Sequence, residues 1–179
     1  MAGYFSAATF RQVGNAATTQ NLLTIENIDA TKLVTIRRVV FQMDATAALA
    51  AVMPIIRTQR TSGVPTGGTT LAKAQWDTAN GSNANTIVRS ATATDGGANS
   101  GPTATPDAAQ LVWQQYGMRL HTAVGQVLGP DNSQLPGLAD TQNFILRQNQ
   151  ALVVGVIATI GTSNPATNHY FVEVVWQED

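Results

Sequence analysis

The sequence predicts an all-β protein, an antiparallel β-sandwich of jelly-roll-like form with an extended N-terminal arm and long loops. About eight short runs rich in β-branched and aromatic residues, separated by turn signals, favour this fold class. No long apolar segment with helical spacing accompanies them, so a doubly wound α/β fold is disfavoured. We find no internal repeat and no second domain in the 179 residues.

The first half of the chain divides into a weakly patterned start and a set of strand-like runs. Residues 1–20 are expected to form an N-terminal arm or an edge strand, and residues 21–179 a single sandwich domain. The strand candidates of this half are residues 21–28, 31–43 and 52–61, of which 31–43 is the clearest because it is rich in Val, Ile, Thr and Phe. Between the last two, residues 44–51 are Ala-rich and are interpreted as one helical turn or a loop.

Turn residues and strand-like runs also alternate through the second half. The expected loops, rich in Gly, Pro, Asn and Ser, are 62–69, 80–85, 94–107, 129–140 and 161–168. Residues 71–78 form a short helix or an irregular connection. The expected strands are 86–92, 111–120, 124–128, 143–147, 151–160 and 169–177. Strict alternation in the last strand predicts that Tyr170, Val172, Val174 and Trp176 share one face.

The composition favours a subunit that packs against copies of itself. Charged residues make up 12% of the chain, about half the usual share of roughly 25%, and small polar residues take their place. Lys32 and Lys73 are the only lysines, so the positive charge is nearly all arginine, which interfaces tolerate better than lysine. With a net charge of −1 and no basic patch larger than Arg37–Arg38, we do not expect nucleic-acid binding.

Several segment types are not expected from this sequence. The chain has no cysteine, which excludes disulfides and thiolate zinc sites. Its first residues lack the positive and apolar regions of a signal peptide. The longest apolar run, residues 45–56, is too short to span a bilayer. No contact with a membrane is therefore expected.

A catalytic, cofactor or metal site is not expected either. The two histidines, His121 and His169, have no Gly-x-Ser-x-Gly motif beside them and are most simply hydrogen-bonded or surface residues. The nearest approaches to a calcium loop, at Asp131-Asn132-Ser133 and Asp95-Gly96-Gly97, have the composition of ordinary turns. Glu173, in the middle of a predicted strand, is interpreted as a solvent-facing or interface carboxylate. The sequence therefore predicts no enzyme.

Aromatic residues outside the expected core are the candidates for contact with other subunits. Tyr4, Phe5 and Phe10 lie on the predicted arm, where they would dock on a neighbouring subunit or back on their own sheet. Trp76 lies in a loop-like segment and is a candidate for a contact surface. If the arm exchanges between subunits, deleting residues 1–10 should leave the domain folded and weaken assembly.

Three segments, residues 57–90 (RTQRTSGVPTGGTTLAKAQWDTANGSNANTIVRS), 113–129 (WQQYGMRLHTAVGQVLG) and 144–173 (FILRQNQALVVGVIATIGTSNPATNHYFVE), resemble small virion structural proteins of tailed bacteriophages and prophages. The resemblance implies a non-enzymatic subunit of the virion, made in the bacterial host cytoplasm. It implies a capsid decoration or cement protein that forms a homo-oligomer, with a trimer favoured, and that contacts the major capsid protein or other virion proteins. It supplies no site residues. The alternative is a tail, fibre or baseplate component that contacts a host receptor.

Overall fold

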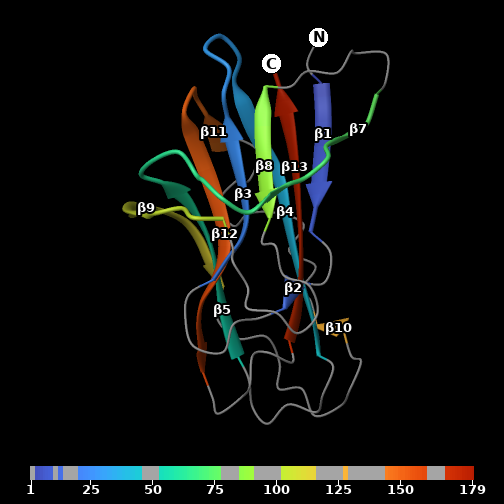
Figure 1. Ribbon diagram of the computed structural model, residues 1–179, viewed down its shortest axis with the longest axis vertical. Coiled ribbons are helices and arrows are strands. Elements are labelled where there is room, and N and C mark those ends of the chain that lie inside the picture. The colour runs from blue at the N-terminus through green and yellow to red at the C-terminus, as the bar shows by residue number, and fades with distance from the viewer. Residues whose placement is uncertain are drawn as a thin grey trace.

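The structure is a computed structural model of the chain, and it describes residues 3–9, 12–13, 20–45, 53–77, 85–90, 102–115, 127–128, 144–160 and 168–179. Within these residues every regular element is a β-strand (Figure 1). The strands form two antiparallel sheets that pack face to face. The all-β sandwich predicted from the sequence is therefore confirmed.

The first sheet, sheet A, is built around the last strand of the chain. Its order is β10 (Val127–Leu128), β4 (Val34–Ala45), β13 (Asn168–Glu178), β1 (Gly3–Ala8) and β7 (Ala74–Gln75). Two short strands pair beside this path, β11 (Phe144–Leu146) with β4 and β2 (Gln12–Val13) with β13.

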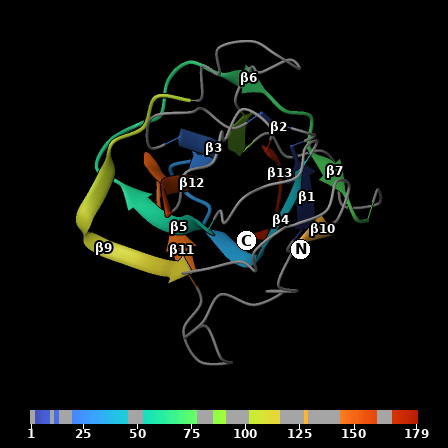
Figure 2. The ribbon, with the colours of Figure 1, turned by 90° about the horizontal axis from the view of Figure 1, so that it is seen from below.

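The second sheet, sheet B, contains six strands in a single path. Its order is β6 (Thr69–Thr70), β8 (Thr86–Ser90), β3 (Gln20–Asn27), β12 (Gln150–Ile160), β5 (Met53–Thr61) and β9 (Pro106–Gln115). Seen along the long axis, the two sheets enclose the core between them (Figure 2).

The order of the strands is jelly-roll-like. Strands β1, β3, β4 and β5 alternate between the two sheets along the chain, and β12 and β13 then return between them. Strand β13 lies between β1 and β4, while β12 lies between β3 and β5. Both closing strands thus pair with strands distant in sequence, as in the double Greek key of a jelly roll.

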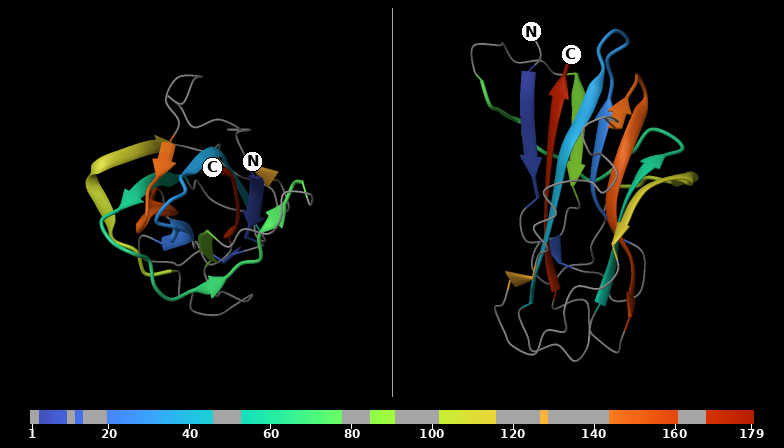
Figure 3. Two further views of the ribbon diagram at one scale, coloured as in Figure 1. Left: turned by 90° about the horizontal axis from the view of Figure 1, so that it is seen from above. Right: turned by 180° about the vertical axis from the view of Figure 1, so that it is seen from behind.

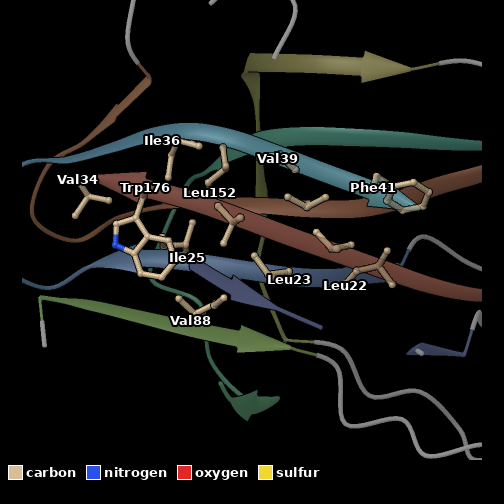
Figure 4. Close-up of a cluster of buried hydrophobic side chains, with 14 of the residues drawn as sticks. Leu22, Leu23, Ile25, Val34, Ile36, Val39, Phe41, Val88, Leu152 and Trp176 are labelled. Carbon is tan, nitrogen blue, oxygen red and sulfur yellow. The ribbon is translucent and has the colours of Figure 1, made fainter. Parts of the chain in front are cut away.

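The alternation of β13 builds the centre of the core. Tyr170, Val172, Val174 and Trp176 are each at most 1% exposed, which confirms their predicted common face. They pack against side chains of both sheets, including Leu23, Ile25, Ile36, Phe41, Leu152 and Val154 (Figure 4). Burial of large apolar side chains of this kind contributes about 1.5–3 kcal/mol each.

A bulge in β3 adds one more leucine to this core. Val154 of β12 pairs with Leu23 while Gly155 pairs with Asn21, so one residue of β3 is extra at this point. Leu22 and Leu23 are both fully buried in the core although they are neighbours in sequence. An extra residue opposite a single partner lets two successive side chains face the same way.

Two antiparallel segments, residues 62–68 and 102–105, lie along the outer face of sheet B and are here called the strap. The segments are joined by reciprocal hydrogen bonds between Thr66 and Thr103, with N···O distances of 2.9 and 2.7 Å. Asn21 of β3 donates to the carbonyls of Pro102 and Ala104. The segment leaving β5 passes outside the sheet to reach β6 (Figures 1 and 2).

Glycines allow the close approach of the strap to the sheet. Gly67 and Gly68 both have positive φ, 65° and 70°, a conformation that costs glycine little. A Cβ on Gly68 would clash with the carbonyl oxygen of Ser90 and would lie 3.4 Å from Pro102. The turn predicted from the Gly67–Gly68 pair is therefore also the point where the chain enters β6.

The outer face of sheet B is buried and partly polar. Thr24 and Glu26 of β3 lie there beside Val153 and Ala151 of β12, and all four are at most 4% exposed. Glu26 Oε2, Thr24 Oγ1 and Arg89 Nε have no hydrogen-bond partner in the part of the chain that the structure describes. Burial raises the pKa of Glu26, and the positive charge of Arg89 opposes the shift.

We expect Glu26→Gln to stabilise the protein at neutral pH. Because the pKa of Glu26 is higher in the folded state than in the unfolded chain, the protonated form favours folding. That contribution is complete below the unfolded-state pKa and is lost as the pH rises through the folded-state pKa. In thermal unfolding from pH 4 to 8, the unfolding temperature of the variant should rise relative to that of the wild type as the pH increases. A constant difference between the two proteins would contradict this assignment.

Most of the strands predicted from the sequence are found close to their expected bounds. The expected strands at 21–28, 52–61, 86–92, 143–147, 151–160 and 169–177 correspond to β3, β5, β8, β11, β12 and β13. The turn at 148–150 contains Asn149 with a φ of 59°. Residues 71–77 are irregular around the short β7, which decides between the two alternatives for this segment.

The N-terminal segment differs from a detached arm. Of the two alternatives for residues 1–20, the described residues 3–8 take that of a strand: β1 pairs with β13 along its whole length, from Gly3 opposite Glu178 to Ala8 opposite Glu173. Only the two residues of β7 pair on its other side. Strand β1 is therefore part of the domain in this structure.

Candidate interaction surface

Two of the predicted contact residues, Tyr4 and Trp76, come together on the outer face of sheet A. Their ring centroids are 6.3 Å apart, with the planes tilted by 31°. Trp76 is 62% exposed and Tyr4 is 42% exposed. They come from different elements, since Tyr4 is on β1 and Trp76 directly follows β7.

Trp76 is held in place although most of its surface is exposed. Its backbone N–H donates to the carbonyl of Tyr4 at 3.0 Å, and its indole Nε1–H donates to Ser6 Oγ at 3.3 Å. The pairing of β7 with Phe5 and Ser6 fixes the segment that carries it. An aromatic ring fixed in this way loses little conformational entropy when a partner binds.

The other two predicted contact residues do not join this pair. Phe5 is 3% exposed and stacks on Trp176, with ring centroids 5.9 Å apart. It faces the core because alternate residues of β1 point to opposite faces of the sheet. Of the two alternatives predicted for Phe5, the structure shows docking on its own sheet, and Phe5 is no longer a candidate for contact with a neighbouring subunit. Phe10 lies outside the described residues.

The surface that surrounds the aromatic pair is the outer face of β1, β13 and β4, here called the open face. Figure 3 (right) shows β7 and β1 at one side of the sheet, followed by β13 and β4. In register across it, Tyr4 lies opposite Gln177 and then Thr35, and Ser6 lies opposite Val175 and then Arg38. The side chains that form the face are Tyr4, Ser6, Ala8, Arg37, Arg38, Phe171, Glu173, Val175, Gln177 and Trp76.

The two sides of the open face carry different side chains. Arg37 and Arg38 share a bulge in β4 opposite Val175. Arg37 donates to Gln177 Oε1 through Nε at 3.1 Å and also through Nη2. Asp179 lies on this side too, since it accepts from Gln177 and its backbone N–H donates to the carbonyl of Leu33, just before β4. The aromatic rings, followed by the exposed Asp77, lie on one side of the face, and the two arginines lie on the other.

Glu178, the best-defined buried carboxylate of the described residues, has a structural role. Glu178 Oε1 accepts hydrogen bonds of 2.9 Å from Trp176 Nε1 and from Thr86 Oγ1, and so joins sheet A to sheet B. Lys73 Nζ donates to the carbonyl of Thr86 at 2.9 Å. Burial lowers the pKa of Lys73, while Glu178 acts in the opposite direction. Since Glu178 is 2% exposed, a substrate could reach it only by opening the sandwich.

The structure gives little support to the other catalytic and metal-site candidates considered from the sequence. Both possible calcium turns and His121 lie outside the described residues. His169 is the second residue of β13 and pairs with Asp44 of β4. In the described part of the chain, no three acidic or histidine side chains gather as a metal site would require. Glu173 is partly exposed on the open face, as either of its two interpretations requires.

The sequence did not identify the arginine side of the open face as part of one surface with Trp76. Arg37–Arg38 was visible as the densest basic spot, but a strict alternation would place the two side chains on opposite faces. The bulge in β4 that brings them together is a tertiary feature. The contact of Ser6 with Trp76 was equally hidden, because it spans 70 positions of the chain.

Comparison of the chain with protein-family models, with curated proteins and with solved structures gives no match. In the residues that the structure describes there is also no helix with the length and apolar character that crossing a bilayer requires.

Proposed function

We propose that this protein is a non-enzymatic structural subunit of a bacteriophage particle, a capsid decoration or cement protein that binds virion proteins and further copies of itself. The resemblance of three long segments to small virion proteins supports this proposal. A compact sandwich with few charged residues also suits a subunit present in many copies, because little charge must be desolvated when such subunits pack.

The observation that carries the proposal is the exposed aromatic pair at one side of the outer face of sheet A. The middle of that face is covered, with Thr35, Val40 and Val175 at most 5% exposed. Its β7 side presents a tryptophan that is 62% exposed and held by two hydrogen bonds. Trp, Tyr and Arg are the residue types that most often dominate binding energy at interfaces, and this face combines all three.

The proposal predicts that the double variant Tyr4→Ala/Trp76→Ala binds phage heads weakly. Purified protein would be mixed with heads of the encoding phage stripped of their accessory proteins, and the bound fraction measured after sedimentation. Loss of two aromatic anchors should weaken binding about 30-fold or more, since such side chains contribute about 2 kcal/mol or more at binding centres.

Val64→Ala is the matched control, because Val64 is also exposed, at 50%, but lies on the strap. This variant should bind heads as the wild type does. Wild-type protein that sediments no better with heads than without them would contradict the decoration role.

A receptor-contacting part of the tail is the second candidate, favoured by the same exposed aromatic pair. Aromatic rings beside carboxylates and amides suit sugar rings and cell-surface polymers as well as proteins. Binding to host cells that is lost in Tyr4→Ala/Trp76→Ala, together with no retention on heads, would assign the protein to this role.

A further inference from the structure

We propose that the open face of sheet A packs against the same face of a second copy, across a two-fold axis that runs along β13. Arg37 and Arg38 of each copy then lie against Tyr4 and Trp76 of the other. The inference rests on the proposed function and deepens it: the aromatic pair contacts a second copy, so the loss of head binding expected for Tyr4→Ala/Trp76→Ala follows from loss of the dimer. It also specifies the geometry of self-association, which the function alone leaves open.

The two sides of the open face are complementary to each other. Tyr4 and Trp76, followed by Asp77, lie on the β1 and β7 side, and the two arginines lie on the β4 side. Between them lie Val175, which is only 4% exposed, and the partly exposed Gln177, neither of which is charged. Guanidinium groups bind well over the faces of Trp and Tyr rings and beside carboxylates. Each side of the face is therefore a partner for the other side.

The register of the sheet places these groups at matching heights. Ser6 of β1, which holds the Trp76 indole, lies in the same row as Val175 and Arg38. Tyr4 lies one row further, with Gln177, whose side-chain oxygen accepts from Arg37. Rotation by 180° about an axis along β13 brings β1 of one copy over β4 of the other without changing the row. The aromatic pair of one copy then faces the two arginines of the other.

The composition of the face fits a protein interface. Its large side chains are Trp, Tyr, Phe and Arg, the types enriched at interfaces. Of the types depleted there, Lys is absent from the face, while Ser6, Ala8 and Glu173 are present. Arg38 Nε is buried and has no hydrogen-bond partner among the described residues. Opposite Glu173, however, the axis places a second Glu173, which is a like-charge contact.

Contact of a face with itself closes on two copies. The pairing therefore favours a dimer, in place of the trimer expected from the resemblance to decoration proteins. The number of copies in solution separates these two arrangements directly.

Two variants with complementary losses test the reciprocal contact. Arg37→Gln/Arg38→Gln removes the basic side, and Tyr4→Ala/Trp76→Ala removes the aromatic side. A homodimer of either variant keeps neither of its two arginine–aromatic contacts, whereas a mixed dimer keeps one. By sedimentation velocity, each variant alone should dissociate about tenfold or more readily than wild type. An equimolar mixture of the two should recover dimer.

Two control variants separate a specific effect at the open face from a general effect of substitution. Arg147→Gln makes the same change at an exposed arginine in the turn between β11 and β12, which is not one of the side chains of the open face, and should dimerise as the wild type does. Glu173→Gln should tighten the dimer, because it removes the like-charge contact on the axis. All variants should melt close to the wild-type temperature.

A wild-type monomer, a wild-type trimer, or a mixture of variants that stays monomeric would overturn the two-fold contact. None of these results would contradict the proposed function if the protein is still retained on phage heads. A wild-type protein that dimerises but is not retained on phage heads would contradict the proposed function and leave the two-fold contact intact.

Discussion

Trp176→Ala is expected to cost about 3–5 kcal/mol of the free energy of unfolding, the range for a large aromatic side chain removed from a core. Trp176 is fully buried, stacks on Phe5 and donates its indole N–H to Glu178. The substitution leaves a cavity between the sheets and removes one of the two donors to a buried carboxylate. Since single domains unfold with only about 5–15 kcal/mol, much of the stability should disappear.

Urea unfolding followed by fluorescence and circular dichroism measures this loss. Trp176→Phe serves as the matched variant, because it keeps an aromatic ring against Phe5 while removing the hydrogen bond to Glu178 and part of the ring volume. It should be destabilised clearly less than Trp176→Ala. A loss below about 1 kcal/mol for Trp176→Ala would show that the side chain is not in the core.

Deletion of residues 1–10 is expected to abolish cooperative folding. It removes β1, which pairs with β13 over six residues and contributes Phe5 and Ala7 to the core. It also exposes the ring face of Trp176 on which Phe5 stacks and leaves the edge of β13 unpaired along that length. This outcome replaces the expectation that the truncated domain stays folded and loses only its assembly contacts.

Thermal unfolding of the truncated chain tests the role of β1. Tyr4→Ala is the matched control, since Tyr4 is on the same strand but faces solvent, and it should unfold within about 0.5 kcal/mol of the wild type. A truncated protein with the wild-type unfolding midpoint would show that β1 is a dispensable arm.

The strands and the sandwich could be predicted because local sequence determines them. β13 alternates large apolar residues with others over its whole length, and this pattern alone gives its core face. The Gly67–Gly68 position was visible as a turn because glycine tolerates positive φ.

The parts that could not be predicted depend on contacts between distant segments. Nothing near residue 5 indicates that Phe5 lies against Trp176, because their pairing joins the two ends of the described chain. The strap requires residues 66 and 103 to meet, and the open face requires a bulge between Arg37 and Arg38. Each of these features depends on which strands pair in the folded sandwich. The local sequence around each residue does not specify that pairing.

The mass of the purified wild-type protein in solution, measured by light scattering over a range of concentrations, tests most directly whether the open face is an assembly surface. We predict a species of twice the 18.9 kDa chain mass that dissociates as the concentration falls. It should also dissociate more readily at high salt, which weakens the charged contacts at the rim of the face. A protein that stays at the mass of one chain at every concentration would contradict self-association through this face.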